Sequence, residues 1–547
     1  MLVHNLSELI ELYLVGIAIS TQGKEWCHTL SSSLPNLRGL SLLYCNLSGP
    51  IDSSLRNLKS LSIIHLNGNN FSSPVPIFFA DFKNLTFLKV SSSRLNGTFP
   101  KKIFQVPTLQ AIDLLKNYDL RDSLPEFPPN VYLQTMLLNY TGFLGSLPHS
   151  IGNLKMLSTI DLSNCNFNGS IPNSWVSLIQ LVYLDMSFNM FSGSIPVFSM
   201  AKNLTNLDLS FNNLTGQITT TQWEELLKLE SLSLDRNSLN ENISVSLFSL
   251  SSLQVLGLSS NQFSGQLKEF PNASSYILES VYLDNNQLEG PIPMSIFELR
   301  GLEGLSLGSN KFNNSLDHSV IQSLKNLSYL DLSHINLLTE YNGFNLSLSS
   351  VPLLTLILAS CKLKRFPDFL RNQSSLSYLD ISKNRIDEEL PNLIWKLPDL
   401  QSLNLSYNYL KTLEGPISNL SIDVPRYLDF PSNQFQGQLP VLPPVSYLDF
   451  SMNNFHSALP AIIGQSLESA EFFSISSNKL YGSIPGFICN ATYLRFVDLS
   501  DNYFNGTIPQ RLIEMSGAFI QVLSLRGKTI SMVQFLIHFQ SLVIYKL

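Results

Sequence analysis

The chain is poor in charged residues. Lys, Arg, Asp and Glu make up 14% of its 547 residues, against about 25% in an ordinary soluble domain. The net charge is −7, and Lys and Arg form no cluster, so binding to nucleic acid has no electrostatic basis. The polar surface must therefore come from uncharged side chains, above all Ser and Asn.

The sequence also lacks the patterns that carry catalysis or metal binding. The 5 cysteines are odd in number and stand singly, without the spacing of metal ligands. No nucleophile paired with His, no HExxH, no Gly-rich phosphate loop and no CxxC occurs. We therefore expect no enzyme activity, no metal and no cofactor.

A long uninterrupted apolar run is missing at both ends. Residues 1–19 carry Glu8 and Glu11, where a signal peptide would have a basic start and an apolar core. Residues 531–547 are apolar but contain Gln534 and His538, and they are shorter than the about 20 residues that cross a bilayer. We interpret them as a tail from a shifted reading frame or a retained intron, and we expect neither a signal peptide nor a membrane helix in this chain.

What the chain does have is a repeat. The phrase LxxLxLxxNxLxGxIP returns about every 24 residues, which is typical of a leucine-rich-repeat solenoid; complete copies begin at Leu181 and Leu494. The pattern predicts an α/β-class, right-handed superhelix with one concave parallel β-sheet and about 20–22 repeats. The array is expected over residues 1–530, with degenerate repeats at both ends and the tail at 531–547.

The Asn at the ninth position of each repeat should stand where the chain leaves the strand. Its amide can satisfy backbone groups on both sides, so stacked Asn residues are expected to form a ladder. The predicted ladder is Asn69, Asn117, Asn189, Asn212, Asn237, Asn261, Asn286, Asn310, Asn384, Asn408, Asn433, Asn453, Asn478 and Asn502. Other residues hold the same position in six repeats: Cys45, Ser93, Thr141, Cys165, Ile335 and Cys361.

The second half of the phrase, LxGxIP, is a plant-type feature. Gly permits a bend, and Pro sets φ where no ladder partner is needed. The Gly position is held by Gly193, Gly290, Gly482 and Gly506. A second short sheet is usual at this part of plant-type repeats.

The chain contains about 19 N-x-[ST] sequons, the acceptor pattern for N-glycans. Their density favours a glycoprotein of the secretory pathway; the alternative is that Leu, Asn and Ser-rich repeats produce the pattern by chance. The candidates are Asn46, Asn84, Asn96, Asn168, Asn203, Asn326, Asn372, Asn404, Asn490 and Asn505.

Outward positions of the concave strands are the natural partner surface of a solenoid, and residues there that break the consensus offer specificity. The ligand-binding candidates are Tyr44, His65, Lys89, Lys116, Tyr140, Tyr183, Phe188, Phe211, Arg236, Tyr282, Tyr329 and His334, all expected on strands. One strand column is aromatic in many repeats, either as hot spots or simply as consensus: Phe87, Tyr183, Tyr329, Tyr378, Tyr427, Tyr447, Phe472 and Phe496.

A column of carboxylates follows two residues after the aromatic column. It could be mistaken for metal ligands or for acid and base catalysts, but we interpret it as a solvated consensus row. Its members are Asp161, Asp185, Asp208, Asp331, Asp380, Asp429, Asp449 and Asp498.

The phrases SLPEFPPN, SIGNLKMLSTIDLSNCNFNGSIP, QLVYLDMSFNMFSGSIPVFSMAKNLT and ICNATYL resemble plant leucine-rich-repeat receptor-like proteins, most closely the Verticillium wilt immune receptors of the nightshade group. The resemblance implies a glycosylated cell-surface protein at the plasma membrane whose extracellular array binds a pathogen-derived or endogenous protein or peptide. It also implies that co-receptor kinases are met only through parts that this chain lacks.

Three functions follow from these observations. The leading hypothesis is a non-catalytic recognition array of an immune receptor-like protein. A second is a secreted solenoid that inhibits or decoys microbial cell-wall hydrolases, against which the length of the array argues. A third is a non-functional truncated receptor copy.

Overall fold

The computed structural model of the chain describes residues 6–19, 23–219, 222–271, 276–313, 323–335, 351–413, 427–440, 442, 444–461, 463–516 and 520–526. The predicted tail at 531–547 lies outside these residues. The chain divides into two units, Met1–Glu289 and Gly290–Leu547, and each is described by itself.

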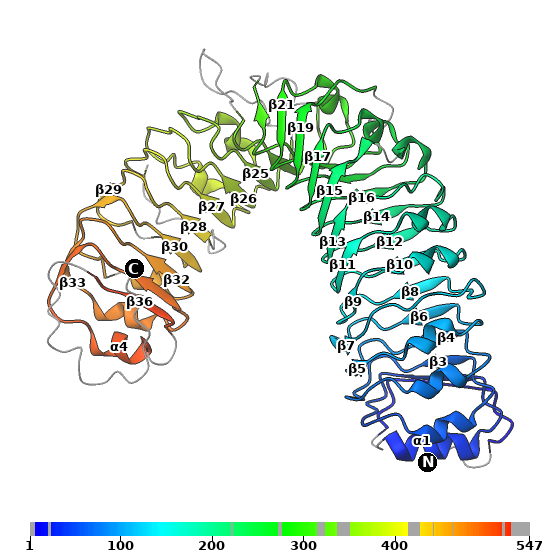
Figure 1. Ribbon diagram of the computed structural model, residues 1–547. Helices are drawn as coiled ribbons and strands as arrows, with labels where there is room; N and C mark the ends of the chain where they lie inside the picture. The colour runs from blue at the N-terminus through cyan, green and yellow to red at the C-terminus, as the bar shows by residue number, and fades with distance from the viewer. Residues whose placement is uncertain are drawn as a thin grey trace. The chain divides into compact units, whose positions relative to one another are not determined.

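The first unit is built on short parallel strands that succeed one another from repeat to repeat (Figure 1). Leu184 lies in register with Ile160 on one side and Leu207 on the other. We call this series the main sheet. Its strands in the first unit are β1 (Glu11–Val15), β2 (Gly39–Leu43), β3 (Ile63–His65), β4 (Phe87–Lys89), β6 (Ala111–Asp113), β8 (Thr135–Leu137), β10 (Thr159–Asp161), β12 (Tyr183–Asp185), β14 (Asn206–Asp208), β16 (Ser231–Ser233), β18 (Val255–Gly257) and β20 (Ser280–Tyr282).

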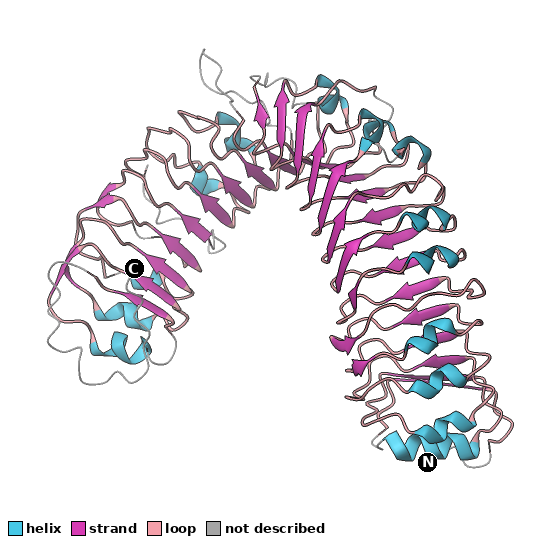
Figure 2. Cartoon of the chain, in the orientation of Figure 1, coloured by secondary structure: helices cyan, strands magenta, loops and turns pink. Residues whose placement is uncertain are grey.

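A second set of parallel strands follows the ladder position, as the LxGxIP phrase predicts. Within the first unit it comprises β5 (Asn96–Thr98), β7 (Asp119–Arg121), β9 (Leu144–Gly145), β11 (Asn166–Ser170), β13 (Met190–Gly193), β15 (Asn213–Gln217), β17 (Ser238–Glu241) and β19 (Gln262–Gln266), followed by β21 (Gln287–Gly290) at the boundary. One helical element then completes most repeats (Figure 2). These are α1 (Gly23–Ser33) and the 3-10 turns η1 (Ser53–Asn57), η2 (Ile77–Asp81), η3 (Lys101–Gln105), η4 (His149–Asn153), η5 (Asn173–Ser177), η7 (Trp223–Glu225) and η8 (Val245–Ser249).

The second unit repeats the same plan. Its main-sheet strands are β22 (Gly304–Ser306), β24 (Tyr329–Asp331), β25 (Thr355–Ile357), β26 (Tyr378–Asp380), β27 (Ser402–Asn404), β28 (Tyr427–Asp429), β30 (Tyr447–Asp449), β32 (Phe472–Ser474), β34 (Phe496–Asp498) and β36 (Val522–Ser524). Its other elements are β23 (Lys311–Phe312), β29 (Gln436–Gly437), β31 (Asn454–Phe455), β33 (Tyr481–Ser483), β35 (Tyr503–Asn505), η9 (Met294–Glu298), η11 (Asp368–Asn372), η12 (Ile394–Lys396), η13 (Gly486–Asn490), α3 (Ile463–Ser466) and α4 (Gln510–Ser516).

The core is the stack of consensus Leu positions. Leu184 and Met186 of one repeat are fully buried, as are Leu403 and Leu405 of another. Side chains alternate along a strand, so the residues on either side of the central Leu face solvent. Burying one such Leu stabilises a repeat by about 1.5–3 kcal/mol. The repeat period therefore determines both the core and the exposed face, and the predicted leucine-rich-repeat solenoid is confirmed.

The predicted Asn ladder is present. Asn189 donates from Nδ2 to the carbonyls of Leu162 (2.8 Å) and Met186 (3.2 Å), and its Oδ1 accepts from the Phe167 N–H (2.9 Å). One amide thus joins two consecutive repeats. A substitute can also act in the ladder: the Ser93 hydroxyl donates to the Leu66 carbonyl at 2.9 Å.

Cysteines also serve in the ladder. The thiol of Cys165 donates to the Leu138 carbonyl at 3.2 Å, and that of Cys361 donates to the Leu332 carbonyl at 3.1 Å. Burial raises the pKa of Cys361 to about 12, so the proton that makes this bond is retained. All 5 cysteines are described, buried and free.

Gly and Pro have the positions that the phrase predicts. Gly193 has φ of +76° and Gly506 has φ of +82°, a region that other residues enter only at a cost. Pro172, at the end of its phrase, caps η5 with φ of −66°. The bend and the short helix of each repeat are therefore encoded locally.

Candidate functional site

Three rows of side chains cross the solvent-facing side of the main sheet. The ring row is the first residue of each three-residue strand, such as Tyr183 in β12. The acid row is the third, such as Asp185. The turn row is the residue directly before each ladder position, such as Phe188. Every candidate binding residue stands in one of these rows.

Five of the candidates are half-exposed strand residues, as predicted. Tyr183 and Tyr329 belong to the ring row, and His65, Lys89 and Tyr282 hold the acid-row position of β3, β4 and β20.

The other seven candidates are not on strands, which corrects the expected placement. They follow the strand in a left-handed turn, with φ between +52° and +62°. The strand ends early because the chain must turn inward to bring the ladder residue into the core. All seven are exposed: Tyr44, Lys116, Tyr140, Phe188, Phe211, Arg236 and His334.

The buried Leu positions, the ladder and the left-handed turn are shared by the repeats, and we call them the frame. This frame imposes the left-handed turn, and the side chains of the turn row do not. Ser260, Asn285, Lys383 and Met452 hold the same place in other repeats and share the same conformation. A residue other than Gly loses about 1–2 kcal/mol there. The frame tolerates this cost, and the turn row carries aromatic, basic, amide and hydroxyl side chains outward.

Two aromatic residues and one arginine stack along the turn row of the first unit. The rings of Phe188 and Phe211 lie 3.9 Å apart and almost parallel, at 15°. The guanidinium of Arg236 lies over the Phe211 ring, 5.0 Å from its centroid. Phe188 is 46% exposed and Phe211 is 37% exposed, so this stack is a surface that a partner can contact.

A longer stack occupies the ring row of the second unit. Tyr427, Tyr447, Phe472 and Phe496 follow one another on β28, β30, β32 and β34, with centroid separations of 4.0, 4.2 and 4.4 Å and interplanar angles of 12°, 11° and 7°. The parallel register places these rings directly side by side. Part of the aromatic column therefore supports itself, in keeping with a consensus role, while its edges and its end remain at the surface.

The acid row has a structural task that the sequence interpretation did not assign. Asp185 Oδ1 accepts the backbone N–H of Ser187 at 2.9 Å, which closes the turn after the strand. The same bond, at 2.8–3.0 Å, joins each Asp of six other repeats to the Ser two residues on: Asp161, Asp208, Asp331, Asp380, Asp449 and Asp498. Burial is the main cause that raises the pKa of Asp208, and the charge of Asp185 raises it further.

Two carboxylates stand out on electrostatic grounds. Asp235, two residues after the acid-row position of β16, lies close to Gly257, where an added Cβ would be 2.2 Å from its Oδ2. Burial, and to a smaller extent the charges of Asp208 and Asp284, raises its pKa to about 6. Asp429 also has a pKa raised to about 6, by burial and then by Asp449 and Asp380. Sequence reasoning did not name Asp235, and it placed Asp429 in the carboxylate column without distinguishing it from the other members. The Pro at 431, two residues after Asp429, was a usable signal.

A polar group lies on the first strands of the first unit. Lys89 and burial both lower the pKa of His65, burial being the larger cause. Asn67 Nδ2 is 3.5 Å from Asp113 Oδ2, while His65 Nε2 and Asn67 Oδ1 are buried without a partner in the described part of the chain. Within those residues, no group of three or more His, Cys, Asp or Glu could hold a metal ion.

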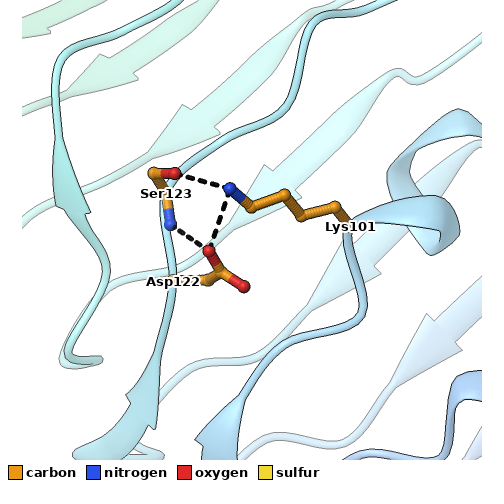
Figure 3. Close-up of polar contacts among 3 residues, drawn as sticks. All are labelled: Lys101, Asp122 and Ser123. Atoms are coloured by element: carbon orange, nitrogen blue, oxygen red, sulfur yellow. Dashed lines mark hydrogen bonds and ion pairs between the residues drawn. The ribbon is translucent and has the colours of Figure 1, made fainter.

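Open hollows lie on the surface of the described residues. One of about 520 Å³ is lined by Lys116, Arg94 and Tyr118. Away from the main sheet, Lys101 of η3 lies 3.1 Å from Asp122 Oδ1 and donates to Ser123 Oγ at 2.7 Å (Figure 3). This contact joins two neighbouring repeats; an exposed pair of this kind contributes about 0–1 kcal/mol, and it has a structural role.

The sequon asparagines differ in accessibility. Seven are exposed, and Asn96, Asn203 and Asn404 are half-buried. Asn404 lies on β27, where its Nδ2 donates to Asp380 Oδ2 at 3.2 Å and its Oδ1 accepts from the Ser406 N–H at 3.0 Å. A glycan is attached through Nδ2, the atom that donates to Asp380, so it would compete with this bond, and Asn404 suits glycosylation least. The glycosylation sites stay predictions.

Comparison with known proteins identifies the class. The family model described as Leucine Rich Repeat matches residues 156–178, 203–221 and 375–397. Receptor-like protein 49 of Arabidopsis thaliana is 37% identical over 175 residues, which is 32% of this chain and 18% of that relative. The chain therefore spans less than two thirds of the length of this relative.

Solved structures agree over almost the whole chain. A plant peptide hormone receptor, RGFR1 in complex with RGF2, is 27% identical with a TM-score of 0.63, covering 96% of this chain and 79% of that one. The Arabidopsis receptor kinase HAESA, in complex with the peptide hormone IDA and the co-receptor SERK1, is 25% identical with a TM-score of 0.62, covering 95% and 87%.

The fold and these comparisons define a leucine-rich-repeat protein. The resemblance to plant leucine-rich-repeat receptor-like proteins is confirmed by the relatives, whereas the closer resemblance to the Verticillium wilt receptors stays a prediction. In the described residues, no helix has both the length and the apolar character to pass through a bilayer.

Proposed function

We propose that this chain is the ligand-recognition array of a plant cell-surface receptor-like protein. It binds a peptide, or an extended segment of a protein, along the solvent-facing side of its main sheet, and it does so without catalysis. The finer part of the proposal is that this ligand is pathogen-derived and that the array lies on the extracellular side of the plasma membrane, where a co-receptor kinase joins the complex.

One observation carries the proposal: the frame is constant, whereas the exposed rows vary. Consecutive repeats share the buried Leu, the ladder and the left-handed turn. In contrast, the turn row changes from Tyr140 to Phe188, Arg236 and His334. A surface of this kind can discriminate between partners without changing the fold, because stability and recognition reside in different residues. The solved relatives bound to peptide hormones support the same class of ligand.

The test uses the full chain expressed with its glycans in a plant host. Peptide fractions of apoplastic fluid from infected and uninfected plants are passed over the immobilised protein, and bound peptides are identified by mass spectrometry. The proposal expects saturable binding of a peptide present after infection, and its loss when Phe188 and Phe211 or Tyr427 and Tyr447 are replaced by Ala.

A matched control is Lys83→Ala together with Lys102→Ala, which alters exposed side chains away from the main sheet. Binding that these variants abolish, and that the sheet variants leave unchanged, would contradict the proposal. Inhibition of a pectin-degrading hydrolase by the same protein, without peptide binding, would favour the inhibitor function instead.

A further inference from the structure

Each described Asp of the acid row, with one exception, accepts the backbone N–H of the residue two positions later. In seven repeats the Asp accepts the N–H of a Ser two residues later. After β28, the residue two positions beyond Asp429 is Pro431, which has no N–H to donate. Among the described residues, no hydrogen bond reaches the carboxylate of Asp429. This half-buried group therefore keeps both oxygens available.

The neighbours of Asp429 do not compensate for the missing bond. On β27, Asn404 Nδ2 donates to Asp380, and Asn404 Oδ1 accepts from the Ser406 N–H. On β30, Asp449 lies directly opposite in the register and is itself an acid. Within the described strands β26 to β34 no Lys or Arg is present. The region consequently carries negative charge that nothing on these strands neutralises.

An aromatic surface borders this carboxylate. Tyr427 is the first ring of the four-ring stack, and Tyr447 covers one of its faces. On the other side its partner in register is Ser402, too small to cover a ring, with Tyr378 one strand further on. Tyr378 and Tyr427 are 36% and 38% exposed. The face of Tyr427 directed toward β27 is thus uncovered by any ring of the described strands.

From this arrangement we infer that Tyr427, Asp429, Ser402 and Tyr378 form a subsite for one lysine or arginine side chain of the bound peptide. The inference rests on the proposed function and names a partner chemistry for it. A cation over the Tyr427 face gains attraction from the ring. Its N–H groups then reach the oxygens of Asp429, which have no internal donor, and charge-assisted bonds of this kind are the stronger ones.

The raised pKa of Asp429, about 6, supports this placement. Burial and the charges of Asp449 and Asp380 disfavour the carboxylate while the subsite is empty. A bound cation reverses this effect, because an opposite charge nearby favours the ionised form. The ionised form of Asp429 is therefore disfavoured in the free protein and is stabilised by the cation in the complex.

The experiment measures fluorescence anisotropy of a fluorescein-labelled peptide of alternating Lys and Ser with the full chain at pH 7.5. The same peptide with acetylated Lys and a version with Glu in place of Lys are the comparison probes. The inference expects saturable binding of the Lys peptide alone. Asp429→Asn should weaken it about tenfold, the effect of one charge-assisted contact.

The chain offers a matched control and a steric test. Asp208→Asn removes one acid-row carboxylate that its Ser already engages, so it measures the general effect of lowering the net charge; binding should change less than about twofold. Ser402→Phe extends the ring stack over the open face of Tyr427 and should abolish binding. The protein should still fold, because Phe472 and Phe496 hold the same position on other strands.

A backbone hydrogen-bond donor can also be supplied to Asp429. Pro431→Ser supplies the N–H that the other repeats have, and it should weaken Lys-peptide binding by about threefold because one oxygen is then engaged. Equal binding of the acetylated peptide, absence of binding, full binding to Ser402→Phe, or an equal effect of Asp208→Asn would each overturn the inference. If an apoplastic peptide binds the array but ignores these variants, the subsite fails while the proposed function stands.

Discussion

The two units share one frame, but their stacks of aromatic residues lie in different rows. In the first unit, Phe188, Phe211 and Arg236 stack along the turn row, while the ring row beside them passes from Tyr183 to Asn206 and Ser231. In the second unit the rings stack on the strands themselves, from Tyr427 to Phe496. The rows therefore vary independently of one another and of the frame.

The physical reason is that the side chains of all three rows face solvent, whereas the core is made of the buried Leu positions and the ladder residues between them. The central Leu and the ladder Asn supply the packing and the hydrogen bonds of the interior. Neither depends on which ring stands on the solvent-facing side. A ring on the strand is half-buried by its neighbours, whereas one on the turn is more exposed. We therefore expect the second stack to contribute more to stability and the first to remain more accessible to ligands.

The largest effect should come from the frame and be equal in both units. Asn212→Leu and Asn433→Leu each leave buried backbone groups without partners. Each should cost about 3 kcal/mol, whereas the Ser variants should cost about half as much, since Ser93 already serves in the ladder. Urea unfolding followed by circular dichroism measures this. Tolerance of Leu in one unit alone would show that the frames are not equivalent.

The ring stacks should differ next. Tyr447→Ala removes a ring that stacks on two neighbours, at centroid separations of 4.0 and 4.2 Å. It should lower the free energy of unfolding by about 2.5 kcal/mol. Phe211→Ala removes one ring and one exposed cation contact and should cost about 1.5 kcal/mol. Double-mutant cycles with Tyr427→Ala and Phe188→Ala isolate the pairs. Equal costs would mean that the row occupied does not affect how much a stack stabilises the fold.

The two carboxylates whose pKa is raised to about 6 give a pH-dependent comparison. The folded-state pKa values of Asp235 and Asp429 are raised to about 6, so the folded protein binds these protons more tightly than the unfolded chain does. Stability therefore falls as pH rises from about 4 through about 6. Asn at either position should stabilise the fold by about 1 kcal/mol at pH 7.5, after allowing for solvent screening, and by almost nothing at pH 4.

The groups that face these carboxylates are acidic in both units. They are Asp208 and Asp284 around Asp235, and Asp449 and Asp380 around Asp429. Thermal unfolding across the pH range measures the effect, with Asp498→Asn as a control. A stability gain that is independent of pH would exclude ionisation as its cause.

The smallest effect concerns the left-handed turn. Ser260 and Ser477 have φ of +55° and +53° in the first and second units. Replacing either by Gly should stabilise by about 0.5–1 kcal/mol, the strain relieved less the added chain entropy. Val at the same positions should destabilise. Differential scanning calorimetry of the matched pair decides whether the turn is equally strained in both units.

Much of the fold could be predicted from local spacing. Leu184 is buried because its position in the period faces the core and is apolar from repeat to repeat, and Asn189 is a ladder residue because the turn would otherwise leave buried backbone groups unpaired. The strand length could not be predicted, so Phe188, Phe211 and Arg236 were expected on strands and lie in turns. The alternation of side chains holds only along the strand. Extending it by two residues therefore gives the wrong placement where the chain leaves the strand.

The candidate site was only partly predictable for the same reason. The rows could be listed from the repeat, but the register of rings between strands depends on repeats that vary in length. Tyr427 and Tyr447 stand only 20 positions apart and yet lie in register, so their stacking follows from the folded pairing. The uncapped Asp429 was visible as the sequence YLDFP, but its meaning depends on the bonds that the other Asp residues make.

By itself, the sequence determined the repeat, the core, the ladder, the bends and the low charge of the surface, because each of these follows from interactions within one repeat or between its immediate neighbours. Only the tertiary structure decided which exposed side chains meet. Three features arise between repeats, where strand register rather than residue order sets the distances. They are the stacking of Phe211 with Phe188 and Arg236, the four-ring stack that begins at Tyr427, and the carboxylate of Asp429 without a donor.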